Sequence, residues 1–339
     1  MRIALDVMGG DHAPTANLNG AKLAIQSLPE IQRLYLVGHE DAIKKHLDDQ
    51  WARHDKIEVV HAGETVAMNE SPAKAIRRKK NSSISIATDL VKDGTCQALV
   101  SAGNTGAAVA AATIKLRNLP GVERAGIASP FPNEHGQCNI VDAGANPEAK
   151  PLHLLQYAVM GAVYSKHVLG KKSPRVGLMS VGTEDEKGTE LTREVFAMLK
   201  ESNLNFIGNI EGHDLFESEI DVIVCDGFTG NVMLKSCEAT ASIMGKWIKQ
   251  EIIKSPLRKL GATLLKSAFK TAMGRGSYEA YGGSPLLGIN GTCIIAHGGS
   301  SALAIKNALR VAAETVSHRV NPHIEEEIAK LCIPQSTHA

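Results

Sequence analysis

The feature that most constrains the fold of this chain is the alternation of short apolar runs with longer amphipathic stretches. The apolar runs have the length expected of buried strands, for example residues 3–7, 98–101 and 222–225. Most are followed by a stretch of helical character, such as residues 105–116 and 152–168. Strands that alternate with helices form a largely parallel sheet with helices on both faces. The sequence therefore predicts an α/β fold of three layers, αβα, with a Rossmann-like and mostly parallel sheet.

The composition of the 339 residues indicates the class of protein. Apolar residues make up 43% and charged residues 22%, the balance of a globular protein with a substantial core, and we expect one domain over residues 1–339. The net charge of +1 gives no overall attraction to nucleic acid. The six cysteines form no Cys-x-x-Cys pair, which favours reduced thiols over zinc sites or disulfides.

The N-terminus and the hydropathy pattern bear on location. The first residues read as a strand and not as a signal peptide. No apolar run approaches the roughly 20 residues that a membrane span requires. We therefore expect a cytoplasmic protein, with peripheral attachment to a membrane left open.

Six predicted strands end in loops that combine small residues with polar side chains. The loops are Asp6-Val7-Met8-Gly9-Gly10-Asp11, Ser101-Ala102-Gly103-Asn104-Thr105-Gly106, Asp142-Ala143-Gly144-Ala145-Asn146, Ser180-Val181-Gly182-Thr183-Glu184-Asp185-Glu186-Lys187-Gly188, Asp226-Gly227-Phe228-Thr229-Gly230-Asn231 and Ala296-His297-Gly298-Gly299-Ser300-Ser301. In a parallel sheet the carboxyl ends of the strands share one edge, where ligands bind. The helix that follows each loop presents unpaired N–H groups and a positive dipole end. We therefore expect the loops to meet in a cradle for a small oxyanion such as phosphate.

Each loop also has an ordinary structural interpretation, because any α/β protein has glycines and helix caps at its strand ends. Two common catalytic motifs are missing from the sequence. There is no phosphate loop ending in Gly-Lys-Ser/Thr, which counts against an ATP-hydrolysing enzyme. There is no Gly-x-Ser-x-Gly elbow either, which disfavours an acyl-serine intermediate.

Four segments carry a family resemblance. Residues 6–11, 101–106 and 226–231, together with Gly282-Gly283-Ser284-Pro285-Leu286-Leu287-Gly288, closely resemble motifs of the bacterial acyl-acyl-carrier-protein:phosphate acyltransferases of phospholipid synthesis. The motifs occur in the same order, and the resemblance extends to about residue 316. It implies a fold similar to isocitrate and isopropylmalate dehydrogenases and to phosphotransacetylases.

The resemblance also implies a reaction and its partners. Acyl carrier protein would donate a fatty acyl group to inorganic phosphate, giving an acyl phosphate. A membrane glycerol-3-phosphate acyltransferase would use that product downstream. The family further implies a homodimer.

Such a reaction requires a phosphate oxygen to attack a thioester carbonyl, so the site must align two anionic partners and stabilise an oxyanion. The catalytic candidates are Lys187 as a cation, Asn231 and Asn104 as amide donors, and His297 as an acid toward the leaving thiol. Each has an alternative role. Lys187 follows three acids and can form a surface ion pair, the asparagines can cap helices, and His297 can be structural.

The remaining candidates are residues that would bind substrate or phosphate. They are Asp6, Gly9, Gly10, Asp11, Arg77, Ser101, Gly103, Thr105, Gly106, Asp142, Asn146, Asp226, Thr229 and Gly230. We expect the glycines to let the backbone approach the anion, and the aspartates to orient loops, since like charges repel. The carboxylates have no metal-ligand spacing, so we expect neither a metal nor a cofactor.

Two segments are basic. Residues 71–83 begin with a Ser-Pro helix start and carry a run of cations that can contact an acidic carrier or phosphate, or can simply be solvated. Residues 246–275 read as a protruding pair of basic amphipathic helices joined at Ser255-Pro256. The apolar residues there, Leu257, Leu260, Leu264 and Leu265, can contact an anionic membrane, an acyl chain or a second subunit.

Three other functions fit parts of the sequence. A phosphotransacetylase acting on short acyl-CoA has the same chemistry but no need for the basic helices. An NAD-linked decarboxylating dehydrogenase has a similar fold but needs a metal-binding carboxylate cluster. A non-catalytic scaffold at the membrane surface would leave the polar loops without a purpose.

Overall fold

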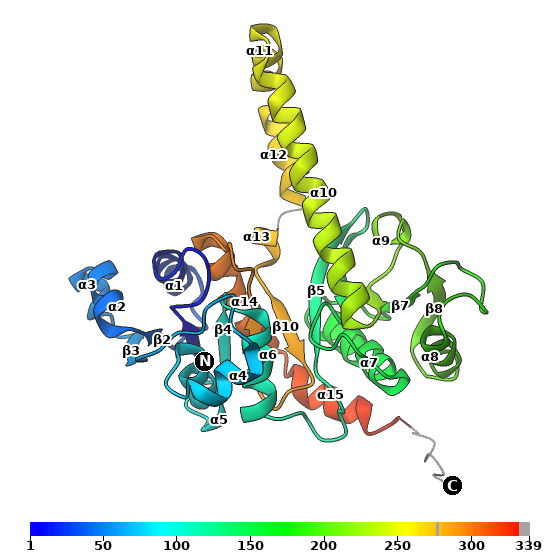
Figure 1. Cartoon of the computed structure of the whole chain (residues 1–339), viewed down its shortest axis with the longest axis horizontal. Coiled ribbons are helices and arrows are strands. Elements are labelled where there is room, and N and C mark those ends of the chain that lie inside the picture. The colour runs from blue at the N-terminus through cyan, green and yellow to red at the C-terminus, as the bar shows by residue number, and fades with distance from the viewer. Residues whose placement is uncertain (276–277, 332–339) are drawn as a thin grey trace.

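One sheet runs through the whole molecule. The computed structural model describes residues 1–275 and 278–331. Within those residues the sheet has 11 strands, in the order β3-β2-β1-β4-β11-β10-β5-β6-β9-β7-β8 (Figure 1). The strands are β1 (Arg2–Asp6), β2 (Arg33–Gly38), β3 (Ile57–His61), β4 (Ala98–Ser101), β5 (Gly126–Asn133), β6 (Gly136–Val141), β7 (Arg175–Met179), β8 (Asn205–Ile210), β9 (Val222–Val224), β10 (Ser284–Leu287) and β11 (Thr292–Ile295).

Helices cover both faces of the N-terminal half of the sheet. On one face lie α1 (Thr15–Ser27) and α14 (Ala302–Ser317), and on the other lie α5 (Ser83–Lys92) and α6 (Thr105–Lys115). Successive side chains of β1 alternate between these two cores, because the side chains of a strand have a period of two. Ile3 and Leu5 belong to the first core and Ala4 to the second.

The other half of the sheet is covered in the same way. On one side lie α7 (Pro151–His167), α8 (Glu190–Lys200) and α15 (Val320–Ile328), and on the other lie α9 (Asp214–Glu217) and the start of α10 (Gly227–Ile253). The shorter helices are α2 (Glu40–His46), α3 (Asp49–Ala52), α4 (Pro72–Arg78) and α13 (Tyr278–Tyr281). The predicted three-layer, Rossmann-like fold is confirmed.

The strands form two parallel sets that run in opposite directions. Strands β1 to β4 and β11 are parallel to one another, and so are β6 to β9. Between the sets, β10 is antiparallel to β11 and to β5, and β5 is antiparallel to β6. The expectation that all six loops share one edge of the sheet is therefore wrong. Three loops end strands of one set and three end strands of the other.

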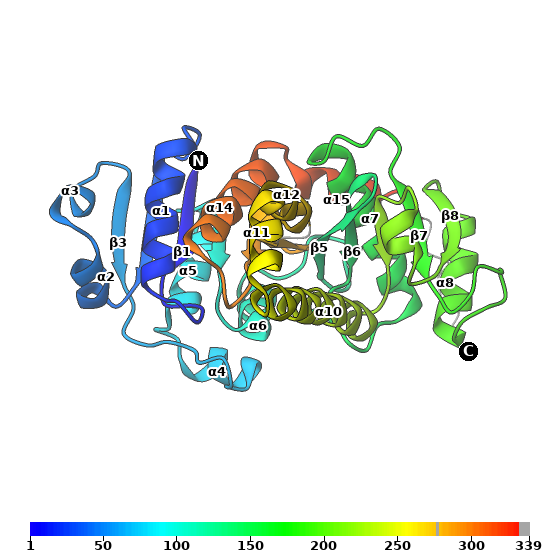
Figure 2. The ribbon, with the colours of Figure 1, turned by 90° about the horizontal axis from the view of Figure 1, so that it is seen from above.

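Twist brings the two sets of strand ends toward each other. Neighbouring strands rotate by about 20–25°, so the four steps from β1 to β5 add up to roughly 90°. β1 is seen from the side in Figure 2, and β5 is seen from the side in Figure 1. Loops from both sets can therefore border one hollow near α6 and α10, although a flat sheet would hold them at opposite edges.

A helical projection leaves the body beside β5 (Figure 1). It consists of the second half of the 27-residue α10, then α11 (Pro256–Leu264) and α12 (Lys266–Arg275). Residues 246–275, for which the sequence predicted two helices, thus contain the end of α10 and two short helices. The chain turns at Ser255-Pro256, and it turns again at Leu265, the C-cap of α11.

Candidate active site

The loops after β1, β4 and β11 meet in one cluster. Ser101 Oγ donates to Asp6 Oδ2 at 2.7 Å, and Gly103 N–H donates to the same Oγ at 3.1 Å. Asp11 N–H donates to the carbonyl oxygen of Gly298 at 2.8 Å and so joins the third loop to the first. Three of the six predicted loops are therefore in direct contact.

This cluster leaves no room for larger side chains. A Cβ on Gly9 would lie 2.7 Å from the backbone nitrogen of Gly103, and Gly10 has a φ of +104°, which favours glycine. Asp6 is buried, and burial raises the pKa of its carboxyl, while hydrogen bonds from hydroxyls such as that of Ser83 oppose the rise. Through Ser101, Asp6 joins the loops after β1 and β4.

Asn17 on α1 supports the same loop, and sequence reasoning missed it. Its side-chain nitrogen donates to the carbonyl oxygens of Val7 and Gly9, both at 2.8 Å. The side chain is only 3% exposed, so these bonds satisfy a buried amide. An asparagine among the apolar positions of a helix was the one available signal.

The loop after β6 folds around Asp142. Its Oδ1 accepts N–H bonds from Ile127, Gly144 and Ala145, and its Oδ2 accepts one from Asn146. Burial raises the pKa of this carboxyl, and the four N–H donors act in the opposite direction. Asp142 therefore shapes its own loop and is turned away from solvent.

The loop after β9 forms the N-terminus of α10. Asp226 caps the helix, because its Oδ1 accepts from Thr229 N–H at 2.9 Å and its Oδ2 accepts from Thr229 Oγ1 at 2.7 Å. Gly230 packs against the carbonyl of Asp142, where a Cβ would overlap it. Asn231 lies beside Gly144, because a Cβ atom built on Gly144 would be 3.4 Å from the Cβ atom of Asn231. The loops after β6 and β9 thus form a second cluster.

Both the oxygen and the nitrogen of the Asn104 side-chain amide form hydrogen bonds. Its Oδ1 accepts from Ala107 N–H at 3.0 Å and so caps α6, and its Nδ2 donates to the carbonyl oxygens of Met68 and Glu70. The side chain therefore fastens the segment before α4 to the start of α6. This is a positioning role, and the amide hydrogens are directed at backbone carbonyls.

A cavity of about 600 Å³ lies between the two loop clusters, and we call it the central cavity. Thr105, Asn231 and His297 are among its polar lining residues, and they come from three of the predicted loops. Its apolar lining comes mainly from β5 and α10 and includes Phe131 and Leu234. The central cavity thus combines polar side chains from three loops with a long apolar surface.

His297 is held in a defined orientation. Its Nδ1 accepts the N–H of Gly299 at 3.0 Å. A neutral imidazole whose Nδ1 accepts must carry its proton on Nε2. The bond from Gly299 holds the ring of His297 at the lining of the central cavity.

Of the predicted catalytic and substrate-binding residues, only Thr105, Asn231 and His297 line the central cavity, and the others lie outside its lining. Lys187 is exposed in the loop after β7, at the outer part of the sheet, where Glu184 O accepts from Asn209 and Asp185 pairs with Lys200. Arg77 is exposed on α4. The four leucines of the projection, Leu257, Leu260, Leu264 and Leu265, are between 54% and 77% exposed.

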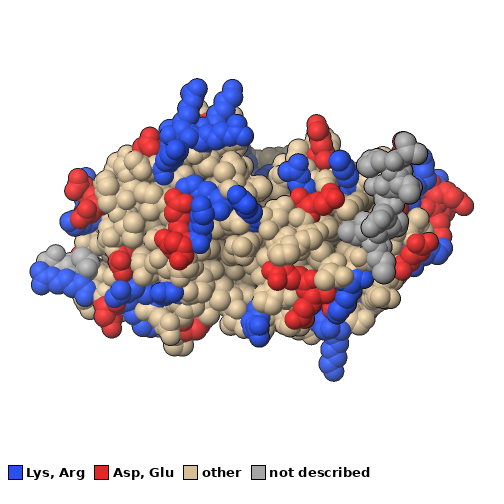
Figure 3. Space-filling model, turned by 90° about the horizontal axis from the view of Figure 1, so that it is seen from below, with Lys and Arg blue, Asp and Glu red and all other residues tan. Residues whose placement is uncertain are grey.

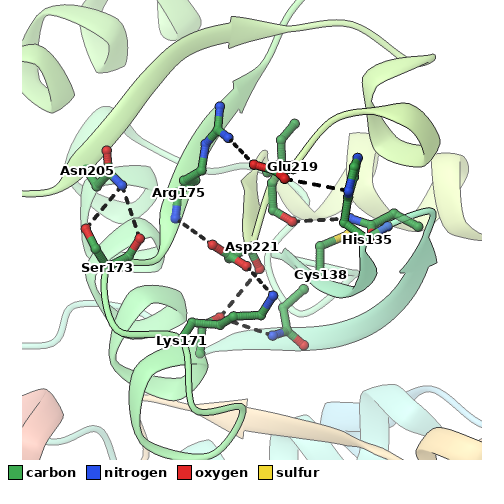
Figure 4. Close-up of polar contacts among 12 residues, drawn as sticks. His135, Cys138, Lys171, Ser173, Arg175, Asn205, Glu219 and Asp221 are labelled. Atoms are coloured by element: carbon green, nitrogen blue, oxygen red, sulfur yellow. Dashed lines mark hydrogen bonds and ion pairs between the residues drawn. The ribbon is translucent and has the colours of Figure 1, made fainter.

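A second hollow, of about 370 Å³, is polar and lies at the start of β7 and β9 (Figure 4). Four of its charged side chains form ion pairs: Lys171 with Asp221 and Arg175 with Glu219, both at 2.9 Å. His135 bonds to the backbone of the segment before β9. These contacts fasten the β5–β6 turn to that segment, so a structural role accounts for the hollow.

Two further features are absent from residues 1–275 and 278–331: a metal site and a membrane-spanning helix. No group of three or more His, Cys, Asp or Glu side chains there is arranged to hold a metal ion. None of the helices found there is long and apolar enough to cross a bilayer.

Comparison with known proteins assigns the family. Residues 1–323 match the family described as fatty acid synthesis protein. The chain belongs to this family. A phosphate acyltransferase of Akkermansia muciniphila is 55% identical over 337 residues, covering 98% of this chain and 97% of the relative. Another, of Pelotomaculum thermopropionicum, is 48% identical over 331 residues, covering 98% and 96%. The predicted acyltransferase of phospholipid synthesis, transferring to phosphate, is confirmed.

Solved structures agree on the fold. A phosphotransacetylase from Streptococcus pyogenes superposes with a TM-score of 0.62 at 15% identity, covering 94% of each chain. The EutD phosphotransacetylase from Staphylococcus aureus gives 0.56 at 16% identity, covering 93% of this chain and 94% of the other. The expected likeness to phosphotransacetylases is confirmed at the level of the fold.

Proposed function

We propose that the protein transfers a fatty acyl group from the thioester of an acyl carrier protein to inorganic phosphate, and that the reaction takes place in the central cavity. The observation that carries this proposal is the lining of the cavity, in which Thr105, Asn231 and His297 adjoin a long apolar surface. An acyl thioester that reacts with phosphate needs both parts. The polar groups serve the reacting carbonyl and the anion, and the apolar surface serves the chain.

The apolar walls suit an extended chain. β5 and α10 both start beside the Asp142 loop and both contribute lining residues along their length. From Asn231 to Ala241, α10 advances about 15 Å, and from Ile127 to Phe131, β5 advances about 13 Å. With carbon–carbon bonds of about 1.5 Å, such a length holds roughly ten carbons of an extended chain.

The chemistry requires no covalent enzyme intermediate. A phosphate oxygen attacks the thioester carbonyl carbon, a C–O bond forms, the C–S bond breaks, and the carrier leaves as a thiolate that takes up a proton. The N-terminus of α6, which begins at Thr105, and that of α10, which begins at Gly227, stabilise anionic charge. The Asn231 amide and the His297 imidazole are the side-chain groups that we assign to the oxyanion or the leaving sulfur.

The test is release of free carrier thiol. Purified protein with acyl carrier thioester should release thiol only when phosphate is present, and acyl phosphate should accumulate in equal amount. Higher kcat/KM with short acyl-CoA than with the carrier thioester would favour the phosphotransacetylase alternative. If no thiol appears with either donor, the scaffold alternative moves ahead and the proposal fails.

We also propose that the chain forms a homodimer through α10. This helix exposes a series of large apolar side chains that includes Ile243, Met244, Trp247 and Ile248, and Trp247 is 54% exposed. Burying them against a second copy removes apolar area from water. Light scattering should give twice the chain mass, and Trp247→Glu should shift the molecule to the monomer.

The tip of the projection is our candidate for contact with an anionic membrane. Leu257, Leu260 and Leu264 are at least 60% exposed on a helix whose segment is rich in lysine. Such a surface lies on anionic bilayers, where a membrane glycerol-3-phosphate acyltransferase would take up the acyl phosphate. Leu260→Glu with Leu264→Glu should reduce flotation with anionic vesicles, and unchanged flotation would exclude the tip.

A further inference from the structure

We propose that the outer surface of α4 and the turn after it is the docking surface for the acidic acyl carrier protein. This surface, called here the α4 basic surface, consists of Lys74, Arg77, Arg78 and Lys80. The inference rests on the proposed function, because it names where the donor of that reaction binds. Its test is a binding measurement that does not require turnover.

The charge of this segment is unbalanced. Five cations occur between residues 74 and 80, and no aspartate or glutamate occurs from residue 71 to residue 88. One cation, Lys79, bonds to Glu70 at 2.6 Å and to the carbonyl oxygen of Thr65. The other four are exposed and have no ion pair or side-chain hydrogen bond within residues 1–275 and 278–331. Concentrated like charge of this kind attracts a partner of opposite charge.

The backbone of α4 fixes the direction of these cations. Ala75 and Ile76 are buried, and Ile76 belongs to the core under α5 and α6. Lys74, Arg77 and Arg78 have the i, i+3, i+4 spacing of a single helix face, which is opposite to the buried one. Figure 3 shows lysine and arginine side chains standing out along the edge of the molecule where α4 lies.

The α4 basic surface lies next to the central cavity. Pro72, the first residue of α4, packs on Gly106, since a Cβ there would lie 2.6 Å from Pro72 Cγ. Thr105, the neighbour of Gly106, lines the central cavity. The Asn104 amide ties Met68 and Glu70, just before α4, to the same point. A carrier on this surface is therefore close enough to insert a flexible thioester arm beside the catalytic groups.

An acidic protein suits this surface better than a membrane does. The apolar residues of α4 face inward, so the surface lacks the apolar anchors that hold amphipathic helices at a bilayer. The exposed leucines lie on the projection, whose tip is at the top of Figure 1, whereas α4 lies low on the body. The two surfaces are therefore far apart. Contact of the tip with a membrane would leave the α4 basic surface accessible to a carrier in solution.

The experiment reverses three charges of the surface, with Lys74→Glu, Arg78→Glu and Lys80→Glu combined in the full chain. Fluorescence anisotropy then measures the Kd of labelled acyl carrier protein. Steady-state rates are measured with carrier thioester and with acyl-CoA of the same chain. A matched control carries three charge reversals at exposed cations elsewhere in the chain: Lys45→Glu, Arg53→Glu and Lys166→Glu.

We expect the Kd and KM for the carrier to rise at least about tenfold in the test variant, with kcat unchanged, because lost charge attraction weakens encounter. KM for acyl-CoA should stay within twofold, and the control should match the wild type. Binding of the wild type should also weaken steeply with added salt. The milder pair Arg78→Ala and Lys80→Ala should give a smaller change in the same direction if the triple variant folds poorly.

Three results would overturn the proposal. The first is carrier affinity that is unchanged in the test variant. The second is an equal loss in the control, which would indicate only net charge. The third is loss of binding to anionic vesicles with carrier affinity retained, which would assign the surface to a membrane. If the wild type binds the carrier but releases no thiol with phosphate, the proposed reaction fails, whereas docking is still decided by the Kd.

Discussion

Replacing Cys237 by tryptophan should convert the central cavity into a site for short acyl chains. Cys237 is half-buried and lines the cavity on α10, six residues beyond Asn231. Along the helix axis it lies about 9 Å from Asn231 and about 6 Å before Ala241. An indole at this position would occupy the apolar part of the cavity beyond that point.

The size of the effect follows from the length of wall that is lost. About 6 Å of wall corresponds to roughly four methylene groups, and each buried methylene contributes about 0.8 kcal/mol. The loss of about 3 kcal/mol lowers kcat/KM for a long-chain donor about a hundredfold. A four-carbon donor reaches only as far as Leu234, so its kcat/KM should change by less than about threefold.

The assay is kcat/KM against donors of four to sixteen carbons, with melting curves for each variant. Ala239→Trp is the matched control, because residue 239 is exposed on the same helix and does not line the cavity. It should leave the chain-length profile unchanged. A uniform loss for all chain lengths in Cys237→Trp, or no loss for any, would refute the assignment of this wall to the acyl chain.

Three further variants test other features of the structure. Gly230→Ala should lower the free energy of unfolding by about 1–3 kcal/mol and slow turnover, because the new methyl group meets the carbonyl of Asp142; an unchanged urea midpoint and rate would contradict that packing. Burial lowers the pKa of His153, although Glu123 opposes this, so the folded state keeps the ring neutral and stability should fall as pH drops below about 6.5. Denaturation at pH 7.5 and 5.5 should show a smaller fall in His153→Gln, and an equal fall would remove His153 as its source. Since Lys187 is exposed outside the cavity lining, Lys187→Ala should keep turnover within about threefold, and a hundredfold loss would show that its loop reaches the substrate.

The site could be predicted from the sequence only in part. Polar loops at strand ends are local features, and the caps that Asn104 and Asp226 form follow from their positions before helices. The support that Asn17 gives to the first loop depends on how α1 packs, and its position among the apolar residues of a helix does not identify the loop that it contacts. The position of Lys187 also depends on the tertiary structure. Its loop ends a strand like the others, but that strand belongs to the outer part of the sheet.

The sequence by itself determined the kinds of element and the chemistry at their ends. Alternating apolar runs and helices dictated a layered α/β fold, and glycines with small polar residues dictated backbone suited to anions. Only the tertiary structure decided which loops share a cavity. The antiparallel pairs at β10 and β5 reverse one half of the sheet, and the accumulated twist turns that half toward the other. Strand direction and twist are properties of paired strands, so they are not encoded in any single segment.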